Sequence, residues 1–172
     1  MKESTAIHLE LDWTQPDILE RHFELRTIDH LLARLCFETV SDACGTFFKE
    51  GSAQESWTFR GEWVHLKPCI IIREIGANEN FAIYKPKFLG GGNLEFMYGT
   101  TFYWRSMGLL GAESGFFSAD NELLLSLNPK PFDLIKVQSK VEINPQSQNM
   151  DELPLLLMLG CYLQVSGRNA SI

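Results

Sequence analysis

The chain lacks an apolar segment long enough to cross a membrane. A spanning helix needs about 20 apolar residues, whereas the longest run, residues 153–165, has 13 and is interrupted by Pro154, Gly160 and Gln164. The first residues also lack a basic stretch followed by an apolar one. We therefore expect neither a secretory signal nor a transmembrane segment, and we predict a cytoplasmic protein.

Cysteine and histidine pairs at metal-binding spacing are also missing. Cys36, Cys44, Cys69 and Cys161 form no C-x-x-C pair and have no histidine at zinc-ligand spacing. The four histidines form neither H-E-x-x-H nor a pair at i, i+4. We predict reduced, buried thiols and no metal or cofactor.

The chain has no excess of positive charge. Its net charge is −7, which disfavours nucleic acid as a partner because nucleic acid is held through basic contacts to phosphates. Only residues 57–105 are positive, with 6 basic and 4 acidic side chains. The candidate anion or headgroup site consists of the basic residues of this segment, Arg60, Lys67, Arg73, Lys85, Lys87 and Arg105. If neighbouring strands bring them together, they could hold an anionic headgroup or an acidic partner; the alternative is ordinary surface charge.

Recognisable catalytic motifs are absent as well. Gly90-Gly91-Gly92 has neither G-x-G-x-x-G nor G-K-[ST] spacing and precedes a strand-like segment, so we interpret it as a hairpin connection. In residues 111–115, Ser114 lies one place too late for a nucleophile elbow, and we expect a loop. His22 and Glu24 share the outward face of one predicted strand, where we expect solvated polar surface. We assign no catalytic residue and predict that the protein is not an enzyme.

Alternation of apolar and polar residues dominates the rest of the chain. Residues 135–143 place Ile135, Val137, Ser139, Val141 and Ile143 on one face, which indicates a half-buried strand. Residues 23–27 and 31–37 read as a hairpin. Further extended runs are residues 7–11, 45–49, 55–60, 68–74, 80–85, 94–97, 101–105, 115–118 and 123–127. Strands at this spacing, with turn residues between them, predict a mainly β, all-antiparallel fold.

The last apolar run predicts a central helix over residues 151–165. A helix that is apolar on all sides is a buried one, and Pro154 is tolerated in a first turn. The core residues of this helix are predicted to be Leu155, Leu156, Leu157, Leu159, Tyr162 and Leu163. The alternative is a peripheral hydrophobic tail that meets a membrane or a partner.

The fold prediction is one domain over residues 1–172, a closed antiparallel barrel around the C-terminal helix. An eight-stranded barrel is filled by its own side chains, and a helix is about 10 to 12 Å across, so enclosing one needs about twelve strands. The alternative is a β-sandwich with the helix packed outside. Trp57, Trp63 and Trp104 could be interfacial anchors, or they could pack in the core or at the rim.

Several segments resemble one known family. They are residues 13–16 (Trp-Thr-Gln-Pro), 24–26 (Glu-Leu-Arg), 57–60 (Trp-Thr-Phe-Arg), 92–96 (Gly-Asn-Leu-Glu-Phe), and 154–157 with 159–163 in the final run. Together they resemble uncharacterised bacterial members of the tubby-like superfamily, which includes LURP-one-related proteins and phospholipid scramblases. The resemblance implies a twelve-strand barrel around a C-terminal helix. Tubby domains bind phosphoinositide headgroups through basic surface residues, whereas the calcium-responsive segment and palmitoylated cysteines of scramblases have no counterpart here.

Three function classes follow. The first is a non-enzymatic binding or scaffold barrel with an unknown protein partner, because the central helix would fill the space where a ligand pocket usually forms. The second is a peripheral binder of anionic phospholipid or phosphoinositide headgroups. The third is an enzyme whose site is assembled from several loops.

Overall fold

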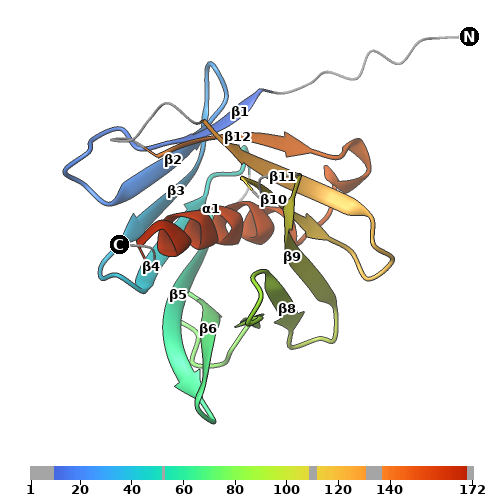
Figure 1. The fold of residues 1–172 in the computed structure, drawn as a ribbon. Helices are drawn as coiled ribbons and strands as arrows, with labels where there is room; N and C mark the ends of the chain where they lie inside the picture. Colours follow the sequence, from blue (N-terminus) through green and yellow to red (C-terminus); the bar gives the residue numbers. More distant parts are fainter. Residues whose placement is uncertain (1–9, 52, 109–111, 131–136, 170–172) are drawn as a thin grey trace, which may run out of the picture.

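The computed structural model describes residues 10–51, 53–108, 112–130 and 137–169. Its described part contains twelve strands, a short 3-10 helix and one α-helix (Figure 1). The strands are β1 (Leu11–Thr14), β2 (His22–Arg26), β3 (Leu31–Phe37), β4 (Asp42–Phe47), β5 (Glu55–Val64), β6 (Lys67–Glu74), β7 (Ala82–Pro86), β8 (Gly92–Phe96), β9 (Thr101–Met107), β10 (Glu113–Phe117), β11 (Leu123–Pro129) and β12 (Gln138–Ile143). They are followed by η1 (Pro145–Ser147) and α1 (Leu153–Asn169).

The strands form a closed antiparallel barrel. Each strand pairs with its neighbours in chain order, and β1 closes the ring on β12 with Leu11 opposite Val141. Closure leaves no strand edge unpaired in the described barrel. The prediction of a mainly β barrel of about twelve strands is therefore confirmed, and the sandwich alternative is wrong.

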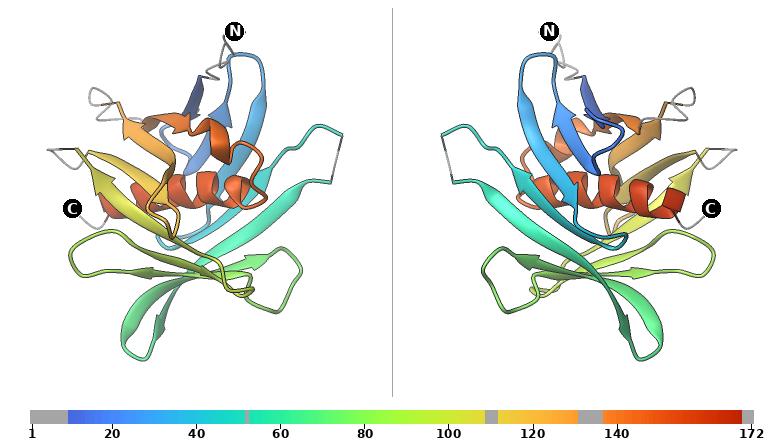
Figure 2. Two further views of the ribbon diagram at one scale, coloured as in Figure 1. Left: turned by 90° about the vertical axis from the view of Figure 1, so that its right-hand side faces the viewer. Right: turned by 90° about the vertical axis from the view of Figure 1, so that its left-hand side faces the viewer.

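Helix α1 runs through the middle of the barrel (Figures 1 and 2). The predicted core residues Leu155, Leu156, Leu157, Leu159 and Tyr162 are at most 2% exposed, as predicted. Leu163 is partly buried and packs against this core. The helix also begins later and ends later than the predicted residues 151–165, with Pro154 in its first turn.

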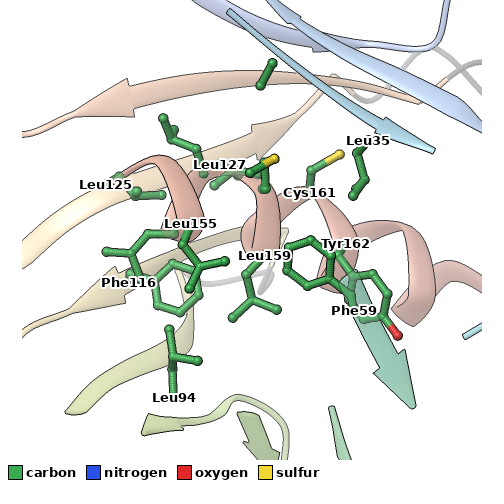
Figure 3. Close-up of a cluster of buried hydrophobic side chains, with 14 of the residues drawn as sticks. Leu35, Phe59, Leu94, Phe116, Leu125, Leu127, Leu155, Leu159, Cys161 and Tyr162 are labelled. Atoms are coloured by element: carbon green, nitrogen blue, oxygen red, sulfur yellow. The ribbon is translucent and has the colours of Figure 1, made fainter. Parts of the chain in front are cut away.

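Small residues let the helix and the sheet approach each other closely. A Cβ atom added to Gly45 of β4 would lie 2.6 Å from the sulfur of Met158 on the helix. Tyr162 stacks between the rings of Phe37 and Phe59, at centroid distances of 5.3 and 5.5 Å, and its hydroxyl donates a 2.6 Å hydrogen bond to the carbonyl of Ser41. Figure 3 shows buried side chains of the helix and the strands, with Phe59 beside Tyr162. The interior is thus filled with side chains from both the helix and the strands.

In β12, burial alternates along the strand as the sequence pattern predicts. Ser139 and Val141 of β12 are 1% exposed and face the core, with Val137 and Ile143 partly buried beside them. Ile135 and the first predicted strand residues, 7–9, lie outside the described residues. Residues 113–115 belong to β10, so the loop predicted there is wrong over that part, and Gly111 is not described.

Among the described residues, no helix is long and apolar enough to span a membrane.

Candidate functional site

The six basic residues of the candidate site lie on one side of the barrel wall. Arg60 is on β5, Lys67 and Arg73 are on β6, Lys85 is on β7, Lys87 follows β7, and Arg105 is on β9. On β5, the neighbours Phe59 and Trp57 point into the core, so Arg60 points outward. Strands β5, β6 and β7 are neighbours in the ring, and only β8 lies between β7 and β9, so the residues lie on one side of the barrel.

The structure does not bring them together in one patch. Arg60, Arg73 and Thr58 line a small pocket of about 170 Å³, which we call the arginine pocket. Arg73 also donates a 2.8 Å hydrogen bond from Nε to the side chain of Asn80. This pair lies toward the β6–β7 turn, because the same pocket includes Gly76 and Ala77.

The other four residues lie farther along the strands. Lys85 forms an ion pair with Glu95 of the neighbouring strand. The cationic groups of Lys87 and Arg105 lie 5.8 and 5.3 Å from the centre of the Tyr103 ring. Lys67 is the first residue of β6 and is exposed. Lys67, Lys87 and Arg105 therefore approach the end of the barrel that carries the β5–β6 and β7–β8 turns.

Those two turns expose large apolar side chains. The exposed fractions are 75% for Trp63, 92% for Leu66, 102% for Phe88 and 94% for Leu89. Consecutive antiparallel strands alternate in direction, so the β5–β6 and β7–β8 turns lie at the same end of the sheet. We call these four residues, with Val64, Lys67, Lys87 and Arg105, the tip surface.

The β5–β6 hairpin extends beyond its neighbour. Its ladder continues to Val64 opposite Lys67, whereas β6 pairs with β7 only from Ile70 to Ile72. Both views in Figure 2 show this hairpin projecting from the barrel. The strand pairing of this hairpin therefore holds Trp63 and Val64 away from the core.

The turn that carries Leu66 has an unfavourable backbone. His65 and Leu66 have φ angles of 49° and 63°, the left-handed region in which a residue with a Cβ costs about 1–2 kcal/mol. Turns of this kind normally use asparagine and glycine. Leu66 therefore does not favour this turn conformation, and because it is exposed it does not contribute to the core.

The three glycines of the β7–β8 turn have a steric role. Gly90 and Gly91 have φ angles of 90° and 72°. A Cβ atom on Gly91 would lie 2.4 Å from the carbonyl oxygen of Trp104, and one on Gly92 would lie 2.4 Å from the Tyr84 side chain. The hairpin interpretation is confirmed, and the close approach of the strands accounts for the glycines.

The sequence predicts the basic residues of the tip surface but not its exposed apolar residues. Trp57 and Trp104 are 4% and 7% exposed and pack in the core, whereas Trp63 is exposed. The run Trp63-Val64-His65-Leu66 could have indicated them, because two consecutive apolar residues there interrupt the alternation of apolar and polar residues just before a turn. Phe88-Leu89, immediately before three glycines, carried the same signal.

Glu24 is not the solvated surface residue that the sequence suggested. It is only 5% exposed, and its carboxylate lies 2.7 Å from Arg26 Nε, 3.1 Å from Arg34 Nη2 and 3.1 Å from His22 Nε2. Burial alone would raise the pKa of this carboxyl, but hydrogen bonds from Arg26, His22 and Arg34 outweigh it and lower the pKa to about 2. These contacts make the cluster an ion network that ties β2 to β3.

The cysteines are free, but only half of them are buried as predicted. Cys69 and Cys161 are buried, whereas Cys36 and Cys44 are partly exposed and lie opposite each other on β3 and β4. Burial is the largest cause that raises the pKa of Cys36, Cys44 and Cys69. A raised pKa keeps a thiol protonated and lowers its reactivity.

Comparisons with protein families, with curated proteins and with solved structures found no match to this chain.

Proposed function

We propose that this protein is a non-enzymatic binding barrel that attaches to anionic phospholipid surfaces through its tip surface. The observation that carries the proposal is the pairing of exposed apolar residues with cations at one end of the barrel. Leu66, Phe88 and Leu89 are each more than 90% exposed, and Lys67 and Lys87 directly follow or precede these turns. A bilayer interface offers both an apolar layer and negative charge, which matches this arrangement.

Rough energies support a reversible attachment. Burial of a large apolar side chain contributes about 1.5–3 kcal/mol when complete, and each lysine or arginine near an anionic leaflet adds about 1 kcal/mol. Partial insertion of the turn residues with three nearby cations therefore suits a peripheral protein. The left-handed backbone at Leu66 fits the same proposal, since strained positions persist where they serve a function.

The non-enzymatic part of the proposal rests on the filled interior. Helix α1 occupies the centre of the barrel, and its residues Leu156 and Leu159 are fully buried. A ligand must therefore bind on the outside or at an end of the barrel.

Membership of the tubby-like superfamily and a cytoplasmic location belong to the same proposal. The closed ring of twelve strands around a C-terminal helix is the architecture that the resemblance implies, and it supports membership at the level of fold. The headgroup-binding role of the six basic residues is likewise proposed. Lys67, Lys87 and Arg105 are its best candidates because they belong to the tip surface.

Vesicle co-sedimentation tests the proposal. The purified protein is expected to sediment with vesicles containing phosphatidylserine or phosphoinositide and not with phosphatidylcholine alone. The double variant Lys67→Glu/Lys87→Glu should lose at least ten-fold in affinity through charge repulsion. The variant Phe88→Ser/Leu89→Ser should lose a similar amount through lost insertion.

Matched controls lie away from the tip surface. Lys140→Glu changes a cation on β12, and Ile28→Ser removes an 88% exposed apolar side chain from the β2–β3 turn. Both should bind vesicles like the unaltered protein. Absence of binding to every vesicle would overturn the lipid proposal and leave a protein partner as the occupant of the tip surface.

A further inference from the structure

Two of the four cysteines face each other across neighbouring strands. Cys36 of β3 and Cys44 of β4 are partners in the antiparallel register, and both are free and partly exposed. Their chain neighbours Leu35 and Ala43 are 0% and 4% exposed and belong to the core. Because side chains alternate between the two faces of a strand, both thiols lie on the outer face of the barrel.

The spacing of the two strands suits a disulfide. The backbone N–H of Glu38 donates a 2.9 Å hydrogen bond to the carbonyl of Asp42, the residue opposite it across the same ladder. Hydrogen-bonded pairs recur at every second position, so Cys36 and Cys44 also form such a pair, with Cα atoms about 5.5 Å apart. Disulfides most often join Cα atoms that are about 5.5–6 Å apart. The two strands therefore need little movement for the bond to form.

The resulting bond would be strained and therefore easily reduced. Cβ atoms directly opposite each other in a ladder are about 4.5–5.5 Å apart, whereas a disulfide brings them to about 3.5–4.5 Å. Strained or exposed disulfides have higher reduction potentials than structural ones. In a reducing compartment, such bonds are usually transient and sense the redox state. A bond at this position suits a switch better than a permanent cross-link.

The other two cysteines lack this arrangement. Cys69 of β6 lies opposite Glu62, and Cys161 lies in helix α1 and is 1% exposed. Among the cysteines of the described strands, Cys36 and Cys44 are the pair that shares a register position. They are also more exposed than Cys69 and Cys161, so a dissolved oxidant reaches them more easily.

We propose that Cys36 and Cys44 form a reversible disulfide when the protein meets a small-molecule disulfide such as glutathione disulfide. One thiolate attacks glutathione disulfide, so a mixed disulfide forms and one glutathione leaves. The second thiolate attacks the protein sulfur of the mixed disulfide, so the bond between the strands forms and the second glutathione leaves. The protein loses two electrons and two protons, and glutathione disulfide takes them up as two molecules of glutathione.

The reduced form persists until such an oxidant is present. Burial is the largest cause that raises the pKa of both thiols. The thiolate is the attacking form, so the first step is slow at neutral pH. The thiol opposite is already in place for the second step, because the strand register holds it there.

Oxidation would act on a segment that contacts the helix. The bond closes a loop over the β3–β4 turn, in which the carbonyl of Ser41 accepts the hydrogen bond from Tyr162. Gly45, the residue after Cys44, is the position of close approach to Met158. The cross-link would therefore tie together the two strands that hold this part of helix α1. This inference does not depend on the proposed attachment to phospholipid.

Mass spectrometry of the full chain after treatment with glutathione disulfide tests the proposal. Tryptic cleavage after Arg34 and Lys49 releases one peptide, residues 35–49, that contains Cys36 and Cys44 and neither of the other cysteines. We expect this peptide to become lighter by two hydrogen atoms, and reduced glutathione to restore its mass. In the variant Cys44→Ser, no second thiol can displace glutathione, so Cys36 should keep one bound glutathione.

Two controls separate the register from general thiol chemistry. Cys69→Ala removes a thiol outside the pair and should leave the rate of oxidation within two-fold. In urea, where the register is lost, bonds to Cys69 or Cys161 should also appear. The same mixture of bonds from the folded protein would overturn the proposal. Retention of both thiols, a bond between two chains, or a bond that reduced glutathione cannot reverse would overturn it as well.

Discussion

The carboxylate of Glu24 shows how much one side chain depends on its neighbours. It lies on the outer face of β2, where the strand pattern predicts contact with water, yet three cationic or hydrogen-bonding partners cover it. A buried carboxylate that accepts several charge-assisted hydrogen bonds stays ionised. Its removal would leave Arg26 and Arg34 without their shared partner.

Replacing Glu24 should reveal this network through pH. Glu24→Gln is expected to lower the free energy of unfolding at pH 7 by about 2 kcal/mol, because hydrogen bonds to a charged group are lost. The pKa of Glu24 is about 2 in the folded protein, against 4.5 for an unperturbed glutamate. The unfolded chain therefore binds more protons between these values, and the stabilisation is complete above pH 4.5 and lost as the pH falls toward 2.

Urea unfolding at pH 7, 4 and 3 measures this difference. The two proteins should become closer in stability at each step down in pH. Glu142→Gln, at an exposed ion pair on β12, is the control and should have a small effect throughout. A gap between Glu24→Gln and the unaltered protein that does not change with pH would contradict the assignment.

Leu66 should show opposite effects on stability and on binding. Leu66→Gly removes the Cβ atom from a left-handed position, so the free energy of unfolding should rise by about 1 kcal/mol. The same change removes an exposed apolar side chain from the tip surface, so vesicle binding should fall. Thermal melting and co-sedimentation measure the two effects on one sample. A variant that melts lower than the unaltered protein would show that the turn is not strained.

Among the secondary-structure elements, helix α1 supplies the centre of the hydrophobic core. It is apolar on all sides over most of its length, and the barrel wall supplies matching apolar side chains from many strands. Hydrophobic packing has no preferred direction, so the close contacts at Gly45 and the hydrogen bond from Tyr162 to Ser41 hold the helix in one position.

A charge in this helix should prevent folding. Leu157 is 2% exposed, and Leu157→Asp would bury a carboxylate with no partner, at a cost that exceeds the total stability of a typical domain unless the group takes up a proton. We expect loss of the cooperative thermal transition in circular dichroism. Leu19→Asp, at an 88% exposed position, should melt like the unaltered protein. A folded Leu157→Asp variant would contradict the central position of the helix.

The whole molecule carries charge of different sign in different places. Its net charge is −7, yet the tip surface carries three cations. At the opposite end of the barrel, four carboxylates, those of Glu55, Glu74, Asp151 and Glu152, line one cleft. Vesicle binding by the tips should weaken as salt rises, because exposed charges are screened over about 8 Å at physiological ionic strength. Apolar insertion is not screened in this way, so part of the binding should survive.

Much of the fold could be predicted from the sequence because its signals are local. Alternation in residues 138–143 and the uniformly apolar run near the C-terminus each specify one element without reference to the rest of the chain. The length of the apolar run and the number of strands then favoured a closed barrel around a helix. Strand ends were less certain: β5 continues to Val64, four residues past the predicted end, because cross-strand pairing with β6 extends it.

The sequence by itself determined the strand pattern, the buried helix and the segment in which basic residues gather. Only the tertiary structure decided which of those residues are neighbours, because lateral distance in a barrel depends on register and on where each ladder ends. It separated Arg60 and Arg73 from Lys67, Lys87 and Arg105. It also placed residues from β5, β6, the β8–β9 turn and the helix start around one cleft. Contacts between residues so far apart in the chain leave no local pattern, and closure of the barrel is what creates them.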